Sequence, residues 1–159
     1  MSLDVIALRE SFALVVERAP DVTSRFYDVF FTRYPQVRIL FGRNTRQKQE
    51  EMLTKALIAV VDHLEDPSWL GGTLKALGAK HVGYNVTEEM YGWVGECLLV
   101  TLAGVLDEEW TPRVAKAWTD AYGAISDAMI AGAREELESW TTSPDLSEVS
   151  EETAPKSAA

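Results

Sequence analysis

The sequence has little cysteine, little histidine and an excess of acidic residues. Cys97 is the single cysteine among 159 residues, which excludes an intramolecular disulfide and any multi-cysteine zinc or iron–sulfur site. It lies in an apolar run, so we interpret it as a buried structural thiol rather than a nucleophile. The formal net charge of −10 argues against non-specific binding to nucleic acid and to anionic membranes.

Long hydrophobic runs are also missing. No apolar run approaches the roughly 18 residues that a membrane-spanning helix needs. A signal peptide would be apolar where this chain has Asp4, Arg9 and Glu10. The composition, 47% hydrophobic and 25% charged, is typical of a globular protein. We therefore expect a soluble, cytoplasmic protein that does not insert into a membrane.

Strand patterns and glycine-rich phosphate loops are absent, and the apolar residues recur with helical spacing, which predicts an all-α fold. Ser2 is expected to cap the first helix, and Gly83 to end another in a left-handed conformation. Helices are expected at about residues 2–18, 20–34, 46–64, 69–82 and 111–140, with a short helical turn at 35–40 and a helix that begins at Thr87.

Composition and helical spacing also predict where the folded domain ends and which face of its first helix is buried. Residues 141–159 are rich in Ser, Thr, Glu, Pro and Ala, so we expect a disordered acidic tail after a folded domain of residues 1–140. In the first helix, the period places five apolar residues inward: Leu3, Ile6, Phe12, Val15 and Val16.

His63 and His81 are the two candidates for any histidine-dependent chemistry. A neutral imidazole is a strong ligand for iron and zinc when a partner holds its second ring nitrogen. Taken alone, however, a histidine on a helix is more often a helix-end charge or a satisfied core residue. The residues around His81 therefore decide between these interpretations.

A series of motifs at fixed spacing resembles the globin domain of bacterial flavohemoglobins and of their single-domain relatives, of the Vitreoscilla hemoglobin kind. The resemblance covers about residues 3 to 138. It rests on Phe26-Tyr27, Tyr34-Pro35, Leu40-Phe41, Gln49 with Leu53, Ala79-Lys80-His81, Tyr91 with Val94-Gly95-Glu96, Ala117-Trp118 and Ala121-Tyr122-Gly123.

The resemblance implies a globin fold, a 3-on-3 sandwich of about seven to eight helices, and a heme b cofactor. His81 is then the proximal ligand of the heme iron. Tyr91 belongs to the proximal side, and Val94 is expected to contact the heme. Lys80 matches a lysine that lies toward the flavin domain in flavohemoglobins, but a solvated helix-end lysine is an equal interpretation.

On the distal side, the resemblance places Tyr27 and Gln49 over the open iron position, with Leu53 one turn beyond Gln49. Phe41 packs on the heme plane. Bound O₂ becomes partly negative, so the Tyr27 hydroxyl or the Gln49 amide can stabilise it by roughly 1–3 kcal/mol. The alternatives are a Tyr27 that only packs in the core and a Gln49 that points outward.

Two departures from the family pattern stand out. We expect no FAD or NAD(P)H site, so any reaction that consumes electrons needs a separate flavin reductase. The last helix of the family usually carries a glutamate that completes a network with the tyrosine and histidine, and counting from Tyr122 places Ala133 there. Without that carboxylate, we hypothesise a neutral, myoglobin-like proximal histidine.

The leading functional hypothesis is reversible O₂ binding, for storage or delivery, at a five-coordinate heme iron. The enzyme alternative is nitric-oxide dioxygenation supported by a separate reductase, with O₂, NO and CO as ligands in either case. A heme-based gas sensor and a globin-like module without heme are further alternatives. The oligomeric state is left as monomer or homodimer, and no nucleic-acid partner is expected.

Overall fold

The computed structural model describes residues 3–142, and these form six α-helices and two 3-10 helices without a strand. The predicted all-α fold is therefore confirmed. The elements are α1 (Val5–Arg18), α2 (Val22–Arg33), η1 (Pro35–Phe41), α3 (Arg46–Asp62), α4 (Pro67–Val82), α5 (Glu88–Leu106), η2 (Asp107–Glu109) and α6 (Pro112–Thr142).

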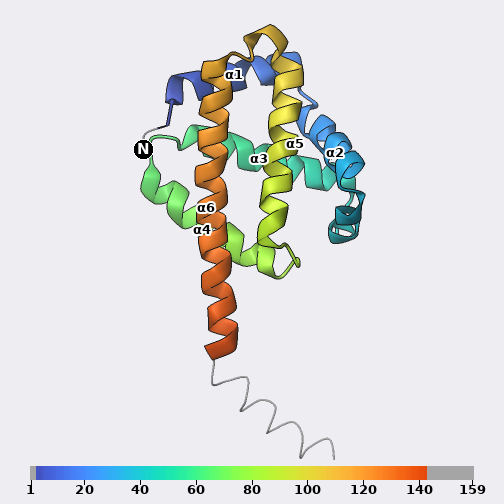
Figure 1. Cartoon of the computed structure of the whole chain (residues 1–159), viewed down its shortest axis with the longest axis vertical. Coiled ribbons are helices and arrows are strands. Elements are labelled where there is room, and N and C mark those ends of the chain that lie inside the picture. Colours follow the sequence, from blue (N-terminus) through green and yellow to red (C-terminus); the bar gives the residue numbers. More distant parts are fainter. Residues whose placement is uncertain (1–2, 143–159) are drawn as a thin grey trace, which may run out of the picture.

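Helices α5 and α6 lie side by side and form the centre of the fold, as Figure 1 shows. Helix α1 packs on both of them at one end, while α2 packs on α5 and α4 packs on α6. Helix α3 packs on α1 and α2, and η1 follows α2 at the edge of the molecule. The far end of α6 extends beyond the other helices (Figure 1).

Polar side chains cap α3, α4 and α6, whereas Thr87 at the predicted start of α5 makes no side-chain cap bond. The Thr45 side chain accepts from the Lys48 N–H at 3.1 Å, and the Asp66 side chain accepts from the Trp69 N–H at 3.2 Å. The predicted cap of the first helix was wrong. Helix α1 begins at Val5, and Asp4 accepts from the Ala7 N–H at 3.2 Å. Ser2 lies outside the described residues.

The predicted left-handed stop at Gly83 was also wrong. Gly83 has a φ of −64°, within the right-handed region, and its N–H donates to the Lys80 carbonyl at 3.1 Å. In the turn that follows, the N–H groups of Tyr84 and Asn85 donate to the carbonyls of His81 and Val82. Asn85 takes the left-handed conformation at a φ of 64°. Asparagine tolerates this region better than most residues, which explains why it can replace glycine here.

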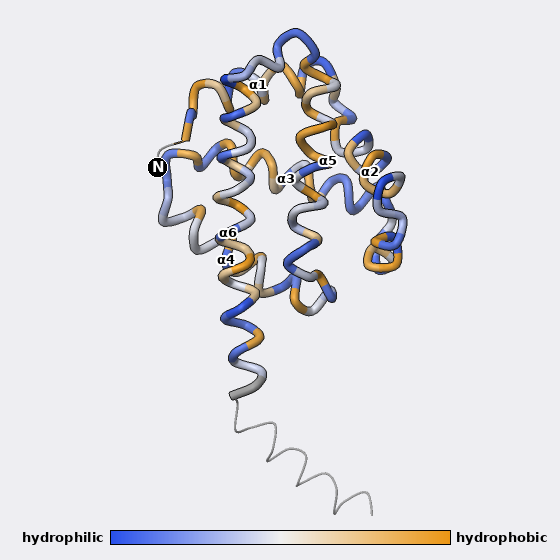
Figure 2. The backbone as a smooth tube through the Cα atoms, in the orientation of Figure 1, coloured by the Kyte–Doolittle hydropathy of each residue, from blue (hydrophilic) through white to orange (hydrophobic). Residues whose placement is uncertain are grey.

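The main core forms where α1, α2, α5 and α6 meet, and the apolar colouring of α5 is visible in Figure 2. Cys97 is fully buried, as predicted. Helix α5 is long and apolar enough to cross a membrane by length and composition, but it is the central helix of this core. The inward assignment of Ile6 and Val16 was wrong, because 61% and 48% of their surfaces are exposed.

Helices α4 and α6 cross so closely that their contact requires glycine on both sides. A Cβ added to Gly78 would lie 1.9 Å from the Met129 carbonyl oxygen, and one added to Gly132 would lie 2.0 Å from that of Lys75. Both clashes involve backbone, which cannot rotate away. Because Gly78 is three residues before His81, this crossing fixes the part of α4 that carries the histidine.

Gly78→Ala is expected to destabilise the protein by about 1–3 kcal/mol through overpacking, although alanine is the better helix former. Gly72→Ala in the same helix is the matched control, since nothing lies within 4 Å of its added Cβ. That control should be neutral or stabilising by up to about 1 kcal/mol. Urea unfolding of both variants measures the difference, and equal unfolding free energies would contradict the close crossing.

Helix α6 ends at Thr142, two residues beyond the predicted boundary at 140. Of the predicted disordered tail, residues 141–159, the part from residue 143 onward lies outside the described residues.

Candidate functional site

His81 lies in the last turn of α4, with its two ring nitrogens in different environments. Its Nδ1 is 2.7 Å from the Leu77 carbonyl oxygen. Burial lowers the pKa of His81 below its usual value, and the bond to Leu77 raises it by a smaller amount. The imidazole is therefore neutral, and since a carbonyl can only accept, Nδ1 carries the hydrogen. The lone pair is on Nε2, as a metal ligand requires.

Tyr91, at the start of α5, is the second predicted residue of this side. It is buried in a small cluster with Leu74 and Met129, and its backbone carbonyl accepts from the Tyr122 hydroxyl at 2.6 Å. The Tyr91 hydroxyl is buried without a hydrogen-bond partner among the described residues. The structure therefore forms no hydrogen bond between Tyr91 and His81 in the described part of the chain.

No carboxylate of α6 reaches this hydroxyl in the described part of the chain. Ala133 is buried on α6 beside Gly132, at the position that the resemblance to flavohemoglobins assigned to a glutamate. Glu135 pairs instead with Lys75 at 3.0 Å. Glu136 accepts from the Trp140 indole N–H at 2.9 Å. The two carboxylates nearest to Ala133 therefore bind side chains on the surfaces of α4 and α6 instead of the Tyr91 hydroxyl.

Tyr27, Phe41 and Gln49 line a common cavity of about 240 Å³ between α2, η1 and α3. Tyr27 is buried, and its ring contacts Phe41 edge to face with centroids 5.7 Å apart. Burial raises the pKa of Tyr27 to about 12, while a hydrogen bond with the Gln49 side chain lowers it slightly. The phenol therefore stays protonated at physiological pH and can donate a hydrogen bond, and Gln49 faces the cavity rather than solvent alone.

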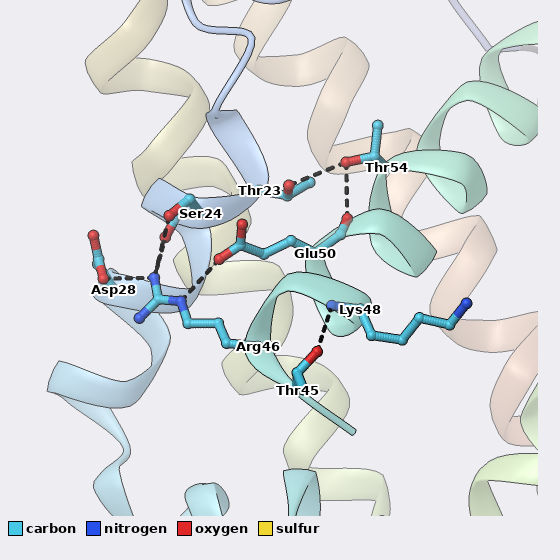
Figure 3. A network of polar contacts seen from close by, with 8 residues as sticks. All are labelled: Thr23, Ser24, Asp28, Thr45, Arg46, Lys48, Glu50 and Thr54. Carbon is cyan, nitrogen blue, oxygen red and sulfur yellow. Dashed lines mark hydrogen bonds and ion pairs between the residues drawn. The ribbon is translucent and has the colours of Figure 1, made fainter. Parts of the chain in front are cut away.

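Arg46 joins α3 to α2 and so fixes one wall of the cavity (Figure 3). Its guanidinium donates to Asp28 at 2.6 Å, to Glu50 at 2.8 Å and to the Ser24 carbonyl at 2.7 Å. Helix α3 starts at Arg46, so this clamp holds the first turn of α3 against α2. Gln49, in the same turn, is thereby held near Tyr27.

Three cavity residues were not predicted from the sequence: Phe31, Arg38 and Arg46. Helical spacing could have found two of them. Phe31 follows Tyr27 by four residues, and Arg46 precedes Gln49 by three, so each shares a helix face with a predicted residue. Arg38 gave no such signal, because η1 is a 3-10 helix whose faces the helical period does not describe.

The remaining predicted site residues lie at the margins of this arrangement. Leu53 and Val94 are half-buried and pack against the main core, and Lys80 is exposed on α4. None of these three lines the cavity. His63 stacks on Trp69 with ring centroids 3.5 Å apart, and its Nδ1 is 2.8 Å from the Ala59 carbonyl oxygen. His63 therefore packs on a neighbouring side chain and does not line the cavity.

Helices α3 and α4 present apolar side chains that remain incompletely buried. Helix α3 has no buried residue, although Leu53, Leu57 and Val60 repeat along one face. Helix α4 buries Leu74 and Gly78. The two helices pack mainly on different neighbours, α3 on α1 and α2, and α4 on α6, while Val60 of α3 also packs against the cluster around Leu74. A flat apolar group between them would complete the burial of both faces.

The chain is similar in sequence to known flavohemoproteins. The chain is 35% identical to a flavohemoprotein of Deinococcus radiodurans over 111 residues, covering 69% of this chain and 28% of that protein. It is 34% identical to a flavohemoprotein of Bordetella pertussis over 133 residues, covering 82% of this chain and 33% of that protein. The chain thus spans about a third of the length of these relatives.

A bacterial globin of Campylobacter jejuni has a similar fold, with a TM-score of 0.73 and 24% identity, covering 84% of this chain and 96% of that chain. The Globin family model matches residues 24–129, which include Tyr27, Phe41, Gln49 and His81. The chain belongs to the globin family.

Proposed function

We propose that this globin holds heme b through His81 and reversibly binds O₂ at a five-coordinate iron. One observation carries the proposal: His81 is neutral, and Leu77 holds its Nδ1–H, so Nε2 is free to bind a metal. Globin family membership implies a heme cofactor, and the assignment to heme b is part of the proposal. The iron would supply the site for the gas.

The residues present fit such a group in two further respects. The apolar faces of α3 and α4 are incompletely buried, as expected when protein atoms alone do not fill the space between them. In the described part of the chain, no cluster of three or more metal-ligating side chains offers another metal site. A prosthetic group that brings its own four nitrogen ligands needs one protein ligand, and His81 supplies it.

On the distal side, the proposal gives each polar residue a role. The Tyr27 hydroxyl would donate a hydrogen bond to a partly negative gas ligand. The Gln49 amide would hold the Tyr27 hydroxyl or donate a second bond, since the two side chains already interact. Phe31 and Phe41 line the same cavity and exclude water, which strengthens these bonds.

The proximal side is expected to push electron density weakly toward iron. His81 bonds to a neutral carbonyl, and neither Glu135 nor Glu136 is available to give it imidazolate character. Resonance Raman of the ferrous protein should show an iron–histidine stretch in the low range of myoglobin-like globins. Ala133→Glu should raise it if the new carboxylate reaches Tyr91. A high, peroxidase-like stretch in the unmodified protein would contradict a neutral proximal histidine.

The alternative function is nitric-oxide dioxygenation with electrons from a separate flavin reductase. It is kept because the same Tyr27 hydroxyl, in the same cavity, can stabilise the partly negative O₂ that NO attacks. The weak proximal push favours the O₂ carrier. Nitrate production from NO, measured with a flavin reductase and NADH supplied, separates the two functions. Slow nitrate formation supports the carrier, and rapid turnover would make the protein an enzyme.

Gas sensing is a third proposal, with NO and CO as further ligands, and it lacks an observation that favours it over the carrier.

The compartment that fits a carrier supported by a separate NAD(P)H-dependent reductase is the cytoplasm. For these proposals, residues 1–140 form the heme-binding unit. The protein acts as a monomer or homodimer.

A further inference from the structure

A basic segment interrupts the acidic surface of this protein. The fifteen residues from 35 to 49 contain no aspartate or glutamate but include Arg38, Arg43, Arg46 and Lys48, in a chain of net charge −10. The segment covers η1, the loop after it and the first turn of α3. Most of its residues are exposed, although Val37 is buried, and it lies at the edge of the molecule where η1 lies (Figure 1).

Three of these four cations are not neutralised. Asp28 and Glu50 both pair with Arg46, whereas no carboxylate pairs with Arg38, Arg43 or Lys48 within the described residues. The Lys48 side chain extends away from the Arg46 network (Figure 3). The positive charge of this segment is thus available to a partner.

An exposed apolar residue lies within the same segment. Ile39 exposes 84% of its surface, more than any other large apolar side chain among the described residues, and it follows Arg38 directly. The apolar stretch that contains it is visible at the outer end of η1 in Figure 2. An apolar centre surrounded by charged residues is the usual composition of a protein-binding surface.

Aromatic and cationic contacts connect this surface to the site. The Arg43 guanidinium lies over the Tyr84 ring, 5.6 Å from its centroid. Tyr84 in turn contacts the His81 ring edge to face, with centroids 5.6 Å apart. From the other side, Arg38 lines the cavity that holds Tyr27 and Gln49 and lies 5.1 Å from the Phe31 ring centroid. The basic surface therefore lies beside both halves of the site.

We propose that the Pro35–Gln49 surface docks the acidic face of an electron-donating flavoprotein. The proposal rests on the proposed heme function, because a heme protein that oxidises to the ferric state needs a donor to restore it. In each encounter, one electron passes from the reduced flavin to ferric iron, which becomes ferrous, and the donor is oxidised by one electron. Opposite charges steer such encounters, and the small interface they require suits a short segment.

The test measures how fast a reduced flavodoxin, a small acidic flavoprotein, reduces the ferric heme-loaded full chain in a stopped-flow instrument. Arg43→Glu/Lys48→Glu should slow reduction by about tenfold or more at low salt. The unmodified protein should also lose rate as salt is raised, and the variant should not. Photoreduced free riboflavin, which is too small to use the surface, should reduce both proteins at similar rates.

The control for net charge is Arg9→Glu/Lys116→Glu, which makes the same change in net charge on α1 and α6, at cations that pair with Glu65 and Asp120. Calorimetric titration of the heme-free chain with oxidised flavodoxin gives a readout that needs no heme chemistry, and weaker binding by the Arg43/Lys48 variant alone supports the proposal. Equal slowing by both variants, or stronger binding of anionic lipid vesicles than of flavodoxin, would overturn it. Failure to bind heme would instead overturn the proposed function and leave the calorimetric test intact.

Discussion

His81→Ala is expected to lower the affinity of the protein for heme by more than about 100-fold. Loss of a residue that only supports a metal ligand costs about 10–100-fold, and this change removes the ligand itself. The rest of α4 should remain in place, because the Gly78 and Gly132 crossing holds it on α6. Hemin titration followed in the Soret band, with the pyridine hemochrome yield, measures the loss.

His63→Ala is the matched control, because it removes a similar imidazole that packs on Trp69 outside the cavity. It should bind heme as the unmodified protein does. A normal heme yield and an unchanged ferrous spectrum in His81→Ala would refute the assignment of His81 as ligand. Circular dichroism of both variants shows whether any loss comes from misfolding instead.

Tyr27→Phe is expected to speed O₂ dissociation by about 5- to 150-fold, which corresponds to the loss of a hydrogen bond worth about 1–3 kcal/mol. The phenol is buried, and its raised pKa of about 12 keeps it protonated, so its hydroxyl can donate a hydrogen bond to the ligand. CO is the weaker hydrogen-bond acceptor, so CO dissociation should change much less. Flash photolysis and stopped-flow measurements on the two gases give both rates.

Tyr34→Phe is the control for this variant. Tyr34 directly follows α2, the helix that carries Tyr27, but its hydroxyl donates to Glu96 at 2.7 Å and its ring stacks on Trp93, so it lies outside the cavity. Its removal should leave both dissociation rates unchanged. Equal acceleration of O₂ and CO release in Tyr27→Phe would show that the ring packs the cavity and that its hydroxyl does not hold the ligand.

Most helix boundaries could be predicted because their signals are local. Thr45, Asp66 and Pro112 act within one turn of the residues they cap or start, so the sequence near them contains the necessary information. The start of α1 was one exception, and Gly83 was another. Beyond Gly83, successive backbone N–H groups donate to carbonyls three residues earlier, and the left-handed residue comes two positions later, at Asn85. The position of that residue depends on how the chain turns from α4 toward α5.

The close crossing of α4 and α6 could not be predicted from the sequence. Gly78 and Gly132 are 54 positions apart, and nothing in either segment shows that the two backbones meet. The inward assignment of Ile6 and Val16 failed for a related reason. The helical period predicts which residues of α1 share a face, but the width of the buried face depends on which neighbouring helices cover α1.

The candidate site was foreseen in outline through the resemblance to globins. That resemblance placed Tyr27, Phe41 and Gln49 together, and the structure brings them around one cavity. The charge environment was not foreseen, because the partners of Arg46 come from both α2 and α3. Likewise, the sequence could not show that the Tyr91 hydroxyl has no partner among the described residues, because that depends on where the carboxylates of α6 lie.

The most direct test of a His81-ligated, O₂-binding heme is one series of optical spectra. The full chain, loaded with one equivalent of heme b, is recorded in its ferric, ferrous, O₂ and CO forms. The account predicts a saturable Soret band at one heme per chain, a five-coordinate ferrous form and an O₂ form that returns to ferrous when O₂ is removed. A chain that gives no Soret band after heme addition, or a ferrous form with two protein ligands, would contradict it.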